Sequence, residues 1–137
     1  MEQTYKGYSF LSAYIKMWKN FADFNGRATR QEFWGASVLD CAVQMLGCFI
    51  FIPIMFIDRD IYMAATYVAC SIYFFASLLP VLAVSVRRLH DVGQSGLVIL
   101  ISFIPFVGEL VLLIFYCLDS QRGTNKYGES EKYPDKQ

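Results

Sequence analysis

Three long apolar stretches, over residues 33–57, 61–86 and 97–118, dominate the pattern of hydrophobic and polar positions along the chain. Each is longer than the roughly 20 residues that a helix needs to cross about 30 Å of hydrocarbon. Short charged clusters lie at the borders of these stretches. The pattern therefore predicts an all-α membrane protein with three transmembrane helices.

Residues 8–24 alternate between apolar and polar positions at helical spacing. One face carries Phe10, Leu11 and Trp18, whereas the opposite face carries Lys16 and Lys19. Such a helix can lie in the headgroup plane, or it can pack on the ends of the spanning helices, and the two placements are compatible. We therefore expect an amphipathic interfacial helix and loop over 1–32, a transmembrane domain over 33–118 and a polar tail over 119–137.

Local signals mark where the helices begin and end. Asn25-Gly26 is a common helix break. Thr29 followed by Glu32 is a capping box ahead of the first apolar stretch, so Glu32 can cap backbone N–H groups there. Ser95 is placed to cap the start of the third apolar stretch.

The second apolar stretch is longer than the membrane requires. Its 26 residues measure about 39 Å as a helix, so we expect it to project from the bilayer at its C-terminal end. The projecting turn carries Arg87, Arg88 and Asp91. Their spacings of three and four residues predict ion pairs from each arginine to Asp91.

Three polar residues lie inside the apolar stretches. Asp40 and Gln44 share a face of the first predicted helix, and Glu109 lies near the middle of the third. Carboxylates within hydrocarbon are costly, so these should face protein or water. Pro105 and Gly108 predict a bend in the third stretch.

Composition, net charge and cysteine spacing exclude several classes of protein. Hydrophobic residues make up 55% of the chain, more than a soluble domain of 137 residues can readily hide, and the formal net charge of zero argues against nucleic acid as a partner. The four cysteines lie in apolar stretches without paired spacing. Neither a metal site nor another cofactor is expected.

The distribution of Lys and Arg bears on orientation, because basic residues favour the cytoplasmic side. Three full spans with a cytoplasmic N-terminus place seven basic residues inside and five outside. A re-entrant third stretch would instead place eleven inside and one outside. The charge favours the re-entrant arrangement, but 22 apolar residues favour a full span, which we take as the expectation.

Four ordered motifs resemble those of the YhaH-like small bacterial inner-membrane proteins, a domain of unknown function. They span roughly residues 8–129 and comprise Phe24-Asn25-Gly26-Arg27-Ala28-Thr29-Arg30-Gln31-Glu32-Phe33-Trp34, Arg87-Arg88-Leu89-His90-Asp91-Val92-Gly93-Gln94-Ser95-Gly96, Ile104-Pro105-Phe106-Val107-Gly108 and Gly123-Thr124-Asn125-Lys126-Tyr127-Gly128. Leu97 and Glu109 depart from the family pattern, which has Trp and an apolar residue there. The resemblance implies a multi-pass protein of the bacterial cytoplasmic (inner) membrane and supplies no mechanism.

Two hypotheses for a site follow. In the first, an anionic lipid headgroup or a protein partner binds a juxtamembrane group formed by Arg27, Arg30, Arg87, Arg88 and His90. Alternatively, these residues form a structural polar network with Thr29, Glu32, Asp91, Asn125 and Tyr127.

The function we expect is that of a non-enzymatic membrane component, surrounded by lipids, that associates with itself or with a membrane partner. His90-Asp91 is the nearest approach to a general base and its orienting carboxylate, but no nucleophile motif accompanies it. The alternative is a small transporter or channel subunit that uses Asp40 and Glu109.

Overall fold

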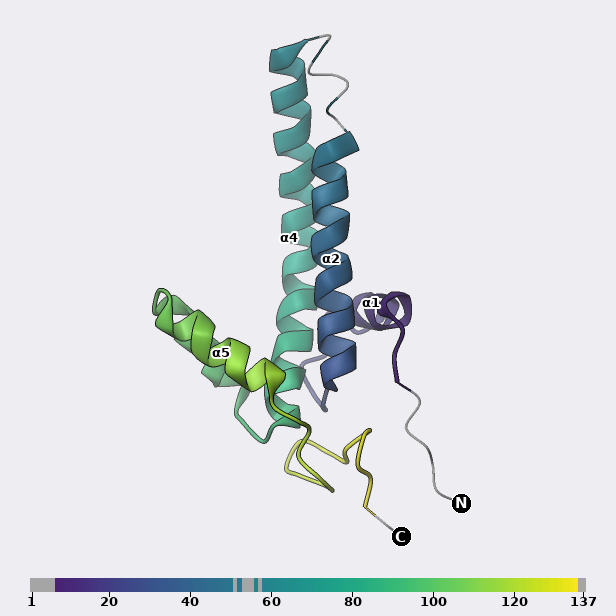
Figure 1. Cartoon of the computed structure of the whole chain (residues 1–137), viewed down its shortest axis with the longest axis vertical. Coiled ribbons are helices and arrows are strands. Elements are labelled where there is room, and N and C mark those ends of the chain that lie inside the picture. Colours follow the sequence, from purple (N-terminus) through teal and green to yellow (C-terminus); the bar gives the residue numbers. More distant parts are fainter. Residues whose placement is uncertain (1–6, 51, 53–55, 57, 136–137) are drawn as a thin grey trace.

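Two long helices lie side by side in the computed structural model, which describes residues 7–50, 52, 56 and 58–135 (Figure 1). Within these residues the only strand-like pairing is an isolated bridge between Asn125 and Gly128. The predicted all-α class is therefore confirmed. In chain order the elements are α1 (Phe10–Lys19), α2 (Arg30–Ile50), α4 (Arg59–Asp91), the 3-10 helix η1 (Gly96–Phe103) and α5 (Val107–Cys117).

The N-terminal amphipathic helix packs against the start of α2. α1 is seen nearly end-on in Figure 1, so its axis runs across that of α2. Ala13 is buried there, and a Cβ on Gly35 would lie 3.0 Å from the Ala13 Cβ, so only small side chains permit this approach. Phe10 and Leu11 remain about 60% exposed (61% and 62%), which leaves an apolar strip of α1 available to lipid.

Both long helices are apolar and long enough to cross a membrane. The Thr29 hydroxyl caps α2 by accepting from the Glu32 N–H at 3.3 Å, and Asp58 caps α4. α4 has 33 residues, about 50 Å, and it continues to Asp91 as expected from the length of its apolar stretch. Pro53 favours a kink near the far end of the first apolar stretch, but this position falls outside the described residues.

The third apolar stretch differs from its prediction. It does not form one spanning helix but folds back on itself as η1 and α5, which together make the arm that projects from α4 in Figure 1. Ser95 caps η1, as expected, and Phe106 adopts φ 62° at the turn. α5 has 11 residues, about 16 Å, which is too short to cross about 30 Å of hydrocarbon.

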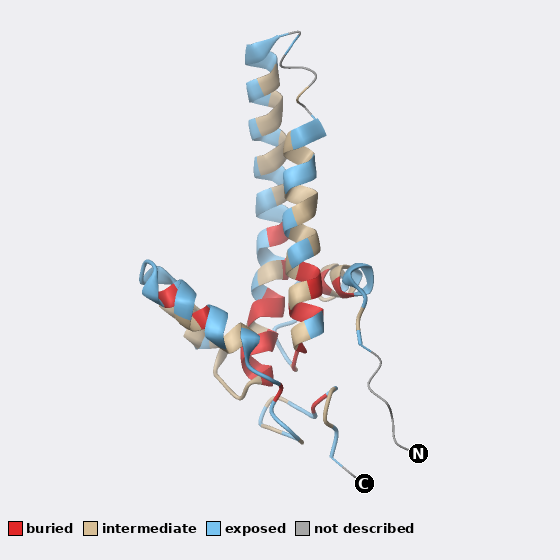
Figure 2. Ribbon diagram, in the orientation of Figure 1, coloured by how far each residue is buried: buried red, intermediate tan, exposed pale blue. Residues whose placement is uncertain are grey.

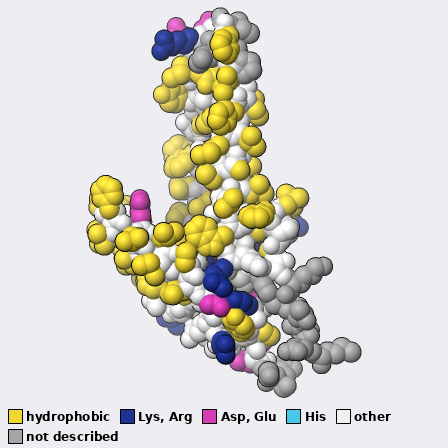
Figure 3. All heavy atoms as spheres, in the orientation of Figure 1, with side chains coloured by type: hydrophobic (Ala, Val, Ile, Leu, Met, Phe, Trp, Pro, Cys, Tyr) yellow, Lys and Arg dark blue, Asp and Glu magenta, His cyan; other side chains and the backbone are white. Residues whose placement is uncertain are grey.

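Burial is concentrated at one end of the helix pair. Figure 2 shows the buried residues gathered where α1, the start of α2 and the end of α4 meet. Farther along both long helices and over the arm, large apolar side chains cover the visible surface (Figure 3). Water would oppose such exposure, whereas lipid does not, so this surface suits a hydrocarbon surrounding.

The contact between α2 and α4 can be tested through two cysteines. The Sγ atoms of Cys48 and Cys70 lie 3.2 Å apart across this contact. Mild oxidation with copper-phenanthroline should join them, so that alkylation of the denatured monomer adds two groups instead of four, as read by intact mass. In the Cys48→Ser control all three remaining thiols should stay reactive, and four alkylated thiols in the oxidised wild type would contradict this helix pairing.

Candidate functional site

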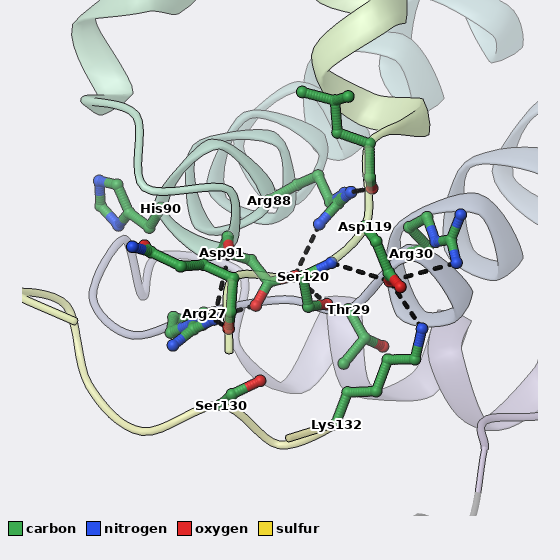
Figure 4. Close-up of polar contacts among 12 residues, drawn as sticks. Arg27, Thr29, Arg30, Arg88, His90, Asp91, Asp119, Ser120, Ser130 and Lys132 are labelled. Carbon is green, nitrogen blue, oxygen red and sulfur yellow. Dashed lines mark hydrogen bonds and ion pairs between the residues drawn. The ribbon is translucent and has the colours of Figure 1, made fainter. Parts of the chain in front are cut away.

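The carboxylate of Asp91, the last residue of α4, lies at the centre of a buried ion network. Its Oδ1 accepts from Arg27 Nε at 3.0 Å, and its Oδ2 accepts from Arg88 Nη1 at 2.6 Å and from the Ser120 hydroxyl. Both arginine side chains and the carboxylate are at most 2% exposed. Figure 4 shows these four residues together, and we call Arg27, Arg88, Asp91 and Ser120 the Asp91 cluster.

Arg27 joins the loop before α2 to the C-terminal tail. Besides the Asp91 side chain, its guanidinium donates to four main-chain carbonyls. Five acceptors match the five N–H groups of a guanidinium, so the donor capacity of Arg27 is used within the protein. The four carbonyls belong to Asp91, Gln121, Gly123 and Gly128.

Arg88 joins the end of α4 to the end of α5. Its Nε donates to the Tyr116 carbonyl at 3.3 Å and its Nη2 to the Leu118 carbonyl. Carbonyls at a helix C-terminus lack partners within the helix and carry partial negative charge, so a guanidinium there is favourable. The ion pair predicted between Arg88 and Asp91 is confirmed.

Glu32 lies at the centre of a second buried group, the Glu32 cluster, formed by Lys16, Glu32 and Arg87. Its Oε1 accepts from Arg87 Nη1 at 2.9 Å and its Oε2 from Lys16 Nζ at 2.7 Å. The predicted pair between Arg87 and Asp91 is therefore corrected, because Arg87 points toward α2. Two of its nitrogens, Nε and Nη2, are buried without a partner among the described residues.

Lys16 also connects α1 to the tail. Its ammonium donates to Glu131 at 2.9 Å and to the Tyr8 hydroxyl at 2.7 Å. Burial lowers the pKa of Lys16, but the hydrogen bonds to Glu32, Tyr8 and Glu131 outweigh it and raise the pKa above its ordinary value. Lys16 therefore stays charged at neutral pH.

His90 packs against the tail. Its ring stacks on Tyr127 with centroids 3.7 Å apart, and its Nδ1 lies 3.2 Å from the Gly26 carbonyl. Asn125 donates to the His90 carbonyl at 3.0 Å. Because the Asp91 oxygens are engaged by the Asp91 cluster, Asp91 does not orient the imidazole as a catalytic base would require.

An exposed ion group lies at the edge of the Asp91 cluster. Asp119 pairs with Arg30 at 3.2 Å and with Lys132 at 2.6 Å (Figure 4). It also accepts a hydrogen bond from the Tyr133 hydroxyl. The hydrogen bond from Lys132 lowers the pKa of Asp119 to about 2. Arg30 and Asp119 are 42% and 45% exposed, which makes Arg30 the most accessible of the four motif arginines.

The three polar residues within the apolar stretches lie in different parts of the structure. Asp40 accepts from the Tyr73 hydroxyl at 2.6 Å, and that hydroxyl lies 3.1 Å from the Tyr14 hydroxyl, so this chain links α1, α2 and α4. Gln44 follows Asp40 by one turn and is half-buried. Glu109 is exposed in the first turn of α5, at a helix start where a carboxylate is favourable, rather than at the centre of a long helix as expected.

Three of the four sequence motifs meet in this region, and the fourth forms the turn of the arm. Two residues of the clusters, Lys16 and Ser120, were not predicted as partners from the sequence. The sequence predicts Lys16 only as part of the polar face of the amphipathic helix, and nothing in the sequence around Ser120 marks it as a partner of Asp91.

Comparisons with known proteins agree with the motifs. Residues 21–129 match the family model described as "Protein of unknown function (DUF805)". The chain is 37% identical over 120 residues to "Inner membrane protein YhaI" of Escherichia coli (strain K12), covering 88% of this chain and 95% of that protein. It is 31% identical over 122 residues to "Inner membrane protein YhaH" of the same strain, covering 87% and 95%.

No solved structure matches the chain. The motifs predicted the YhaH-like family, and both the family model and these relatives confirm it. The relatives of this chain are inner-membrane proteins, and the two long apolar helices of the chain fit the same location. The chain therefore belongs to the DUF805 family of bacterial inner-membrane proteins, whose biochemical function is unknown.

Proposed function

We propose that this protein is a non-enzymatic component of the bacterial inner membrane that binds anionic phospholipid at its cytoplasmic end. The observation that carries the proposal is the position of the cations. Among the described residues, every Lys and Arg except Arg59 belongs to the end where α2 begins and α4 finishes or to the segments attached to it. Each basic residue close to anionic headgroups contributes about 1 kcal/mol of electrostatic attraction to the membrane.

The path of the third apolar stretch supports a cytoplasmic location for this end. η1 starts just after Asp91, and the chain beyond α5 returns to the same place, where the Gln121 N–H donates to the Asp91 carbonyl at 2.9 Å. The stretch thus begins and ends on one side, as in the re-entrant arrangement. By the positive-inside rule, the resulting eleven-to-one distribution of basic residues supports a cytoplasmic location for both termini.

This topology gives a direct prediction. In spheroplasts, epitopes at both termini should resist external protease, and a C-terminal alkaline phosphatase fusion should be inactive. An epitope inserted just before Asp58, between the two long helices, should be cleaved and serves as the matched control. Cleavage of the C-terminal epitope in intact spheroplasts would contradict the re-entrant path.

Lipid binding is assigned to the exposed cations rather than to the buried ones. Arg27 and Arg88 are buried and bind Asp91 and main-chain carbonyls, so they are expected to hold the tail and not a headgroup. The side chains that face outward are Lys19, Arg30, Arg122 and Lys126.

The proposal is tested by native mass spectrometry of the detergent-solubilised protein. The wild type should retain phosphatidylglycerol in preference to phosphatidylcholine. Changing the four outward cations to glutamine should remove most of this preference, because the attraction is electrostatic. Equal retention of phosphatidylglycerol by this folded variant would overturn the proposal.

The transporter or channel hypothesis has less support. Asp40 contacts Tyr73 between the long helices, whereas Glu109 lies on the arm, away from α2 (Figure 1). The contacts among the described residues join Asp40 to α1 and not to Glu109. We therefore do not assign the two acids to one path.

A further inference from the structure

A groove of about 320 Å³ opens where the N-terminus of α1 meets the first turns of α2. Its volume falls at the lower end of the range for small-ligand sites. Gly35, where α2 packs closely on α1, lies at the boundary between the two helices. The lining residues are Tyr8, Phe10, Arg30, Gln31, Trp34 and Gly35.

The lining of the groove is divided between polar and apolar groups. Arg30 and Gln31 supply a cation and an amide, while Phe10 and Trp34 supply aromatic surface. The Tyr8 hydroxyl donates to Glu131 and accepts from Lys16, so it is already paired. An occupant that matches both halves must carry an anionic or strongly polar group joined to an apolar one.

Arg30 has donor capacity left for such an occupant. Its Nη2 pairs with Asp119 at 3.2 Å, and its Nη1 makes a long contact of 3.4 Å with the Cys117 carbonyl. Asp119 is held in turn by Lys132 and Tyr133, so it does not depend on Arg30 alone. With five N–H groups, Arg30 can keep this pair and still donate to a phosphate.

The position of the groove identifies the source of the occupant. Phe10, which lines it, belongs to the exposed apolar strip of α1, while Arg30 and Gln31 lie at the start of a helix long enough to cross the membrane. The groove therefore lies at the level where headgroups meet acyl chains, and aromatic residues such as Trp34 are common at that level. Phospholipids are the amphipathic molecules present there.

We propose that this groove binds one anionic phospholipid, with its phosphate at Arg30 and Gln31 and the start of an acyl chain against Phe10 and Trp34. The inference rests on the proposed function and deepens it by naming the site. It differs from general attraction to the basic surface, because it requires both the charge of Arg30 and the apolar contact of Phe10.

The test measures phosphatidylglycerol retained by the solubilised full chain in native mass spectra. Arg30→Gln should lower retention by more than about fivefold, the loss expected for any one basic residue near a headgroup, because it also removes a charge-assisted hydrogen bond to the phosphate. Phe10→Ser, at a position 61% exposed, should also lower it, whereas Arg30→Lys should preserve it. Arg122→Gln removes an exposed cation outside the groove and serves as the matched control, with a smaller effect expected. Thermal unfolding of each variant confirms that it is folded.

The outcomes separate this inference from the proposed function. If the variant lacking all four outward cations loses retention but Arg30→Gln and Phe10→Ser behave like Arg122→Gln, the groove is overturned and the basic surface stands. If no variant changes retention, both fail. Displacement of the bound lipid by millimolar glycerol phosphate would show that the groove recognises the phosphate alone and would overturn its assignment to a phospholipid.

Discussion

Replacing Asp91 with asparagine is expected to destabilise this protein by about 3–5 kcal/mol, because it leaves two buried cations without their counter-charge. Arg27 and Arg88 are each at most 2% exposed and share this one carboxylate. Asparagine has nearly the same shape but carries no charge. The change should therefore release the tail from the end of α4, where Gln121 and Ser120 now bind Asp91.

The measurement is the thermal unfolding midpoint in detergent, together with the amount of protein in the membrane. Asp119→Asn is the matched control, since Asp119 also pairs with an arginine but is 45% exposed, and it should cost at most about 1 kcal/mol. In the double variant with Arg88→Met, part of the loss caused by Asp91→Asn should be recovered. An Asp91→Asn protein as stable as the wild type would show that the Asp91 cluster does not hold the fold together.

Replacing Gly108 with alanine is expected to open the arm formed by η1 and α5. A Cβ at this position would lie 1.8 Å from the Ile101 carbonyl oxygen and 3.2 Å from the Ser102 Cα. These are backbone atoms, so no side-chain rotation relieves the clash and the two elements must separate. Overpacking of this kind typically costs about 1–3 kcal/mol, and the severity of the overlap points to the upper part of that range.

The opening of the arm can be followed with spin labels at Leu97 on η1 and Leu113 on α5, both exposed, in a cysteine-free background. Gly108→Ala should broaden and lengthen the distance distribution and lower the unfolding midpoint. Gly47→Ala is the matched control, because a Cβ there has no neighbour within 4 Å and alanine favours the helix. An unchanged distance in Gly108→Ala would contradict the close packing of η1 on α5.

Much of the secondary structure could be predicted because its signals are local. The helical spacing of residues 8–24 anticipated α1, and the caps at Thr29 and Ser95 lie where the sequence suggested. Arg88 and Asp91 are one turn apart on a single helix, so their pairing follows from helix geometry alone.

Most residues of the site could be predicted from the sequence, but the partners that they contact could not. Arg87 has Asp91 at an equally suitable spacing, yet it pairs with Glu32, 55 residues earlier. Arg27 binds carbonyls of the tail that carry no side-chain signature at all. These contacts join distant parts of the chain, and their selection depends on how α1, α2, α4 and the tail pack.

The third apolar stretch likewise combines features that the sequence predicts with a chain path that depends on packing. Its length and composition are those of a membrane-crossing helix, and Pro105 with Gly108 marked the bend correctly. Whether the chain continues across the bilayer or turns back depends on packing that is not local. Here Gly108 allows η1 and α5 to touch, and Arg88 binds the carbonyls at the end of α5.

The amino-acid sequence was sufficient to predict the membrane location, the long apolar helices that satisfy their own backbone hydrogen bonds in lipid, and the family. These follow from composition, local spacing and short motifs, in which each residue acts on near neighbours. The tertiary structure was needed to show which of the four motif arginines are buried and which one of them faces outward. Burial removes water from a charge, so each buried arginine needs partners close in space, and these come from any part of the chain.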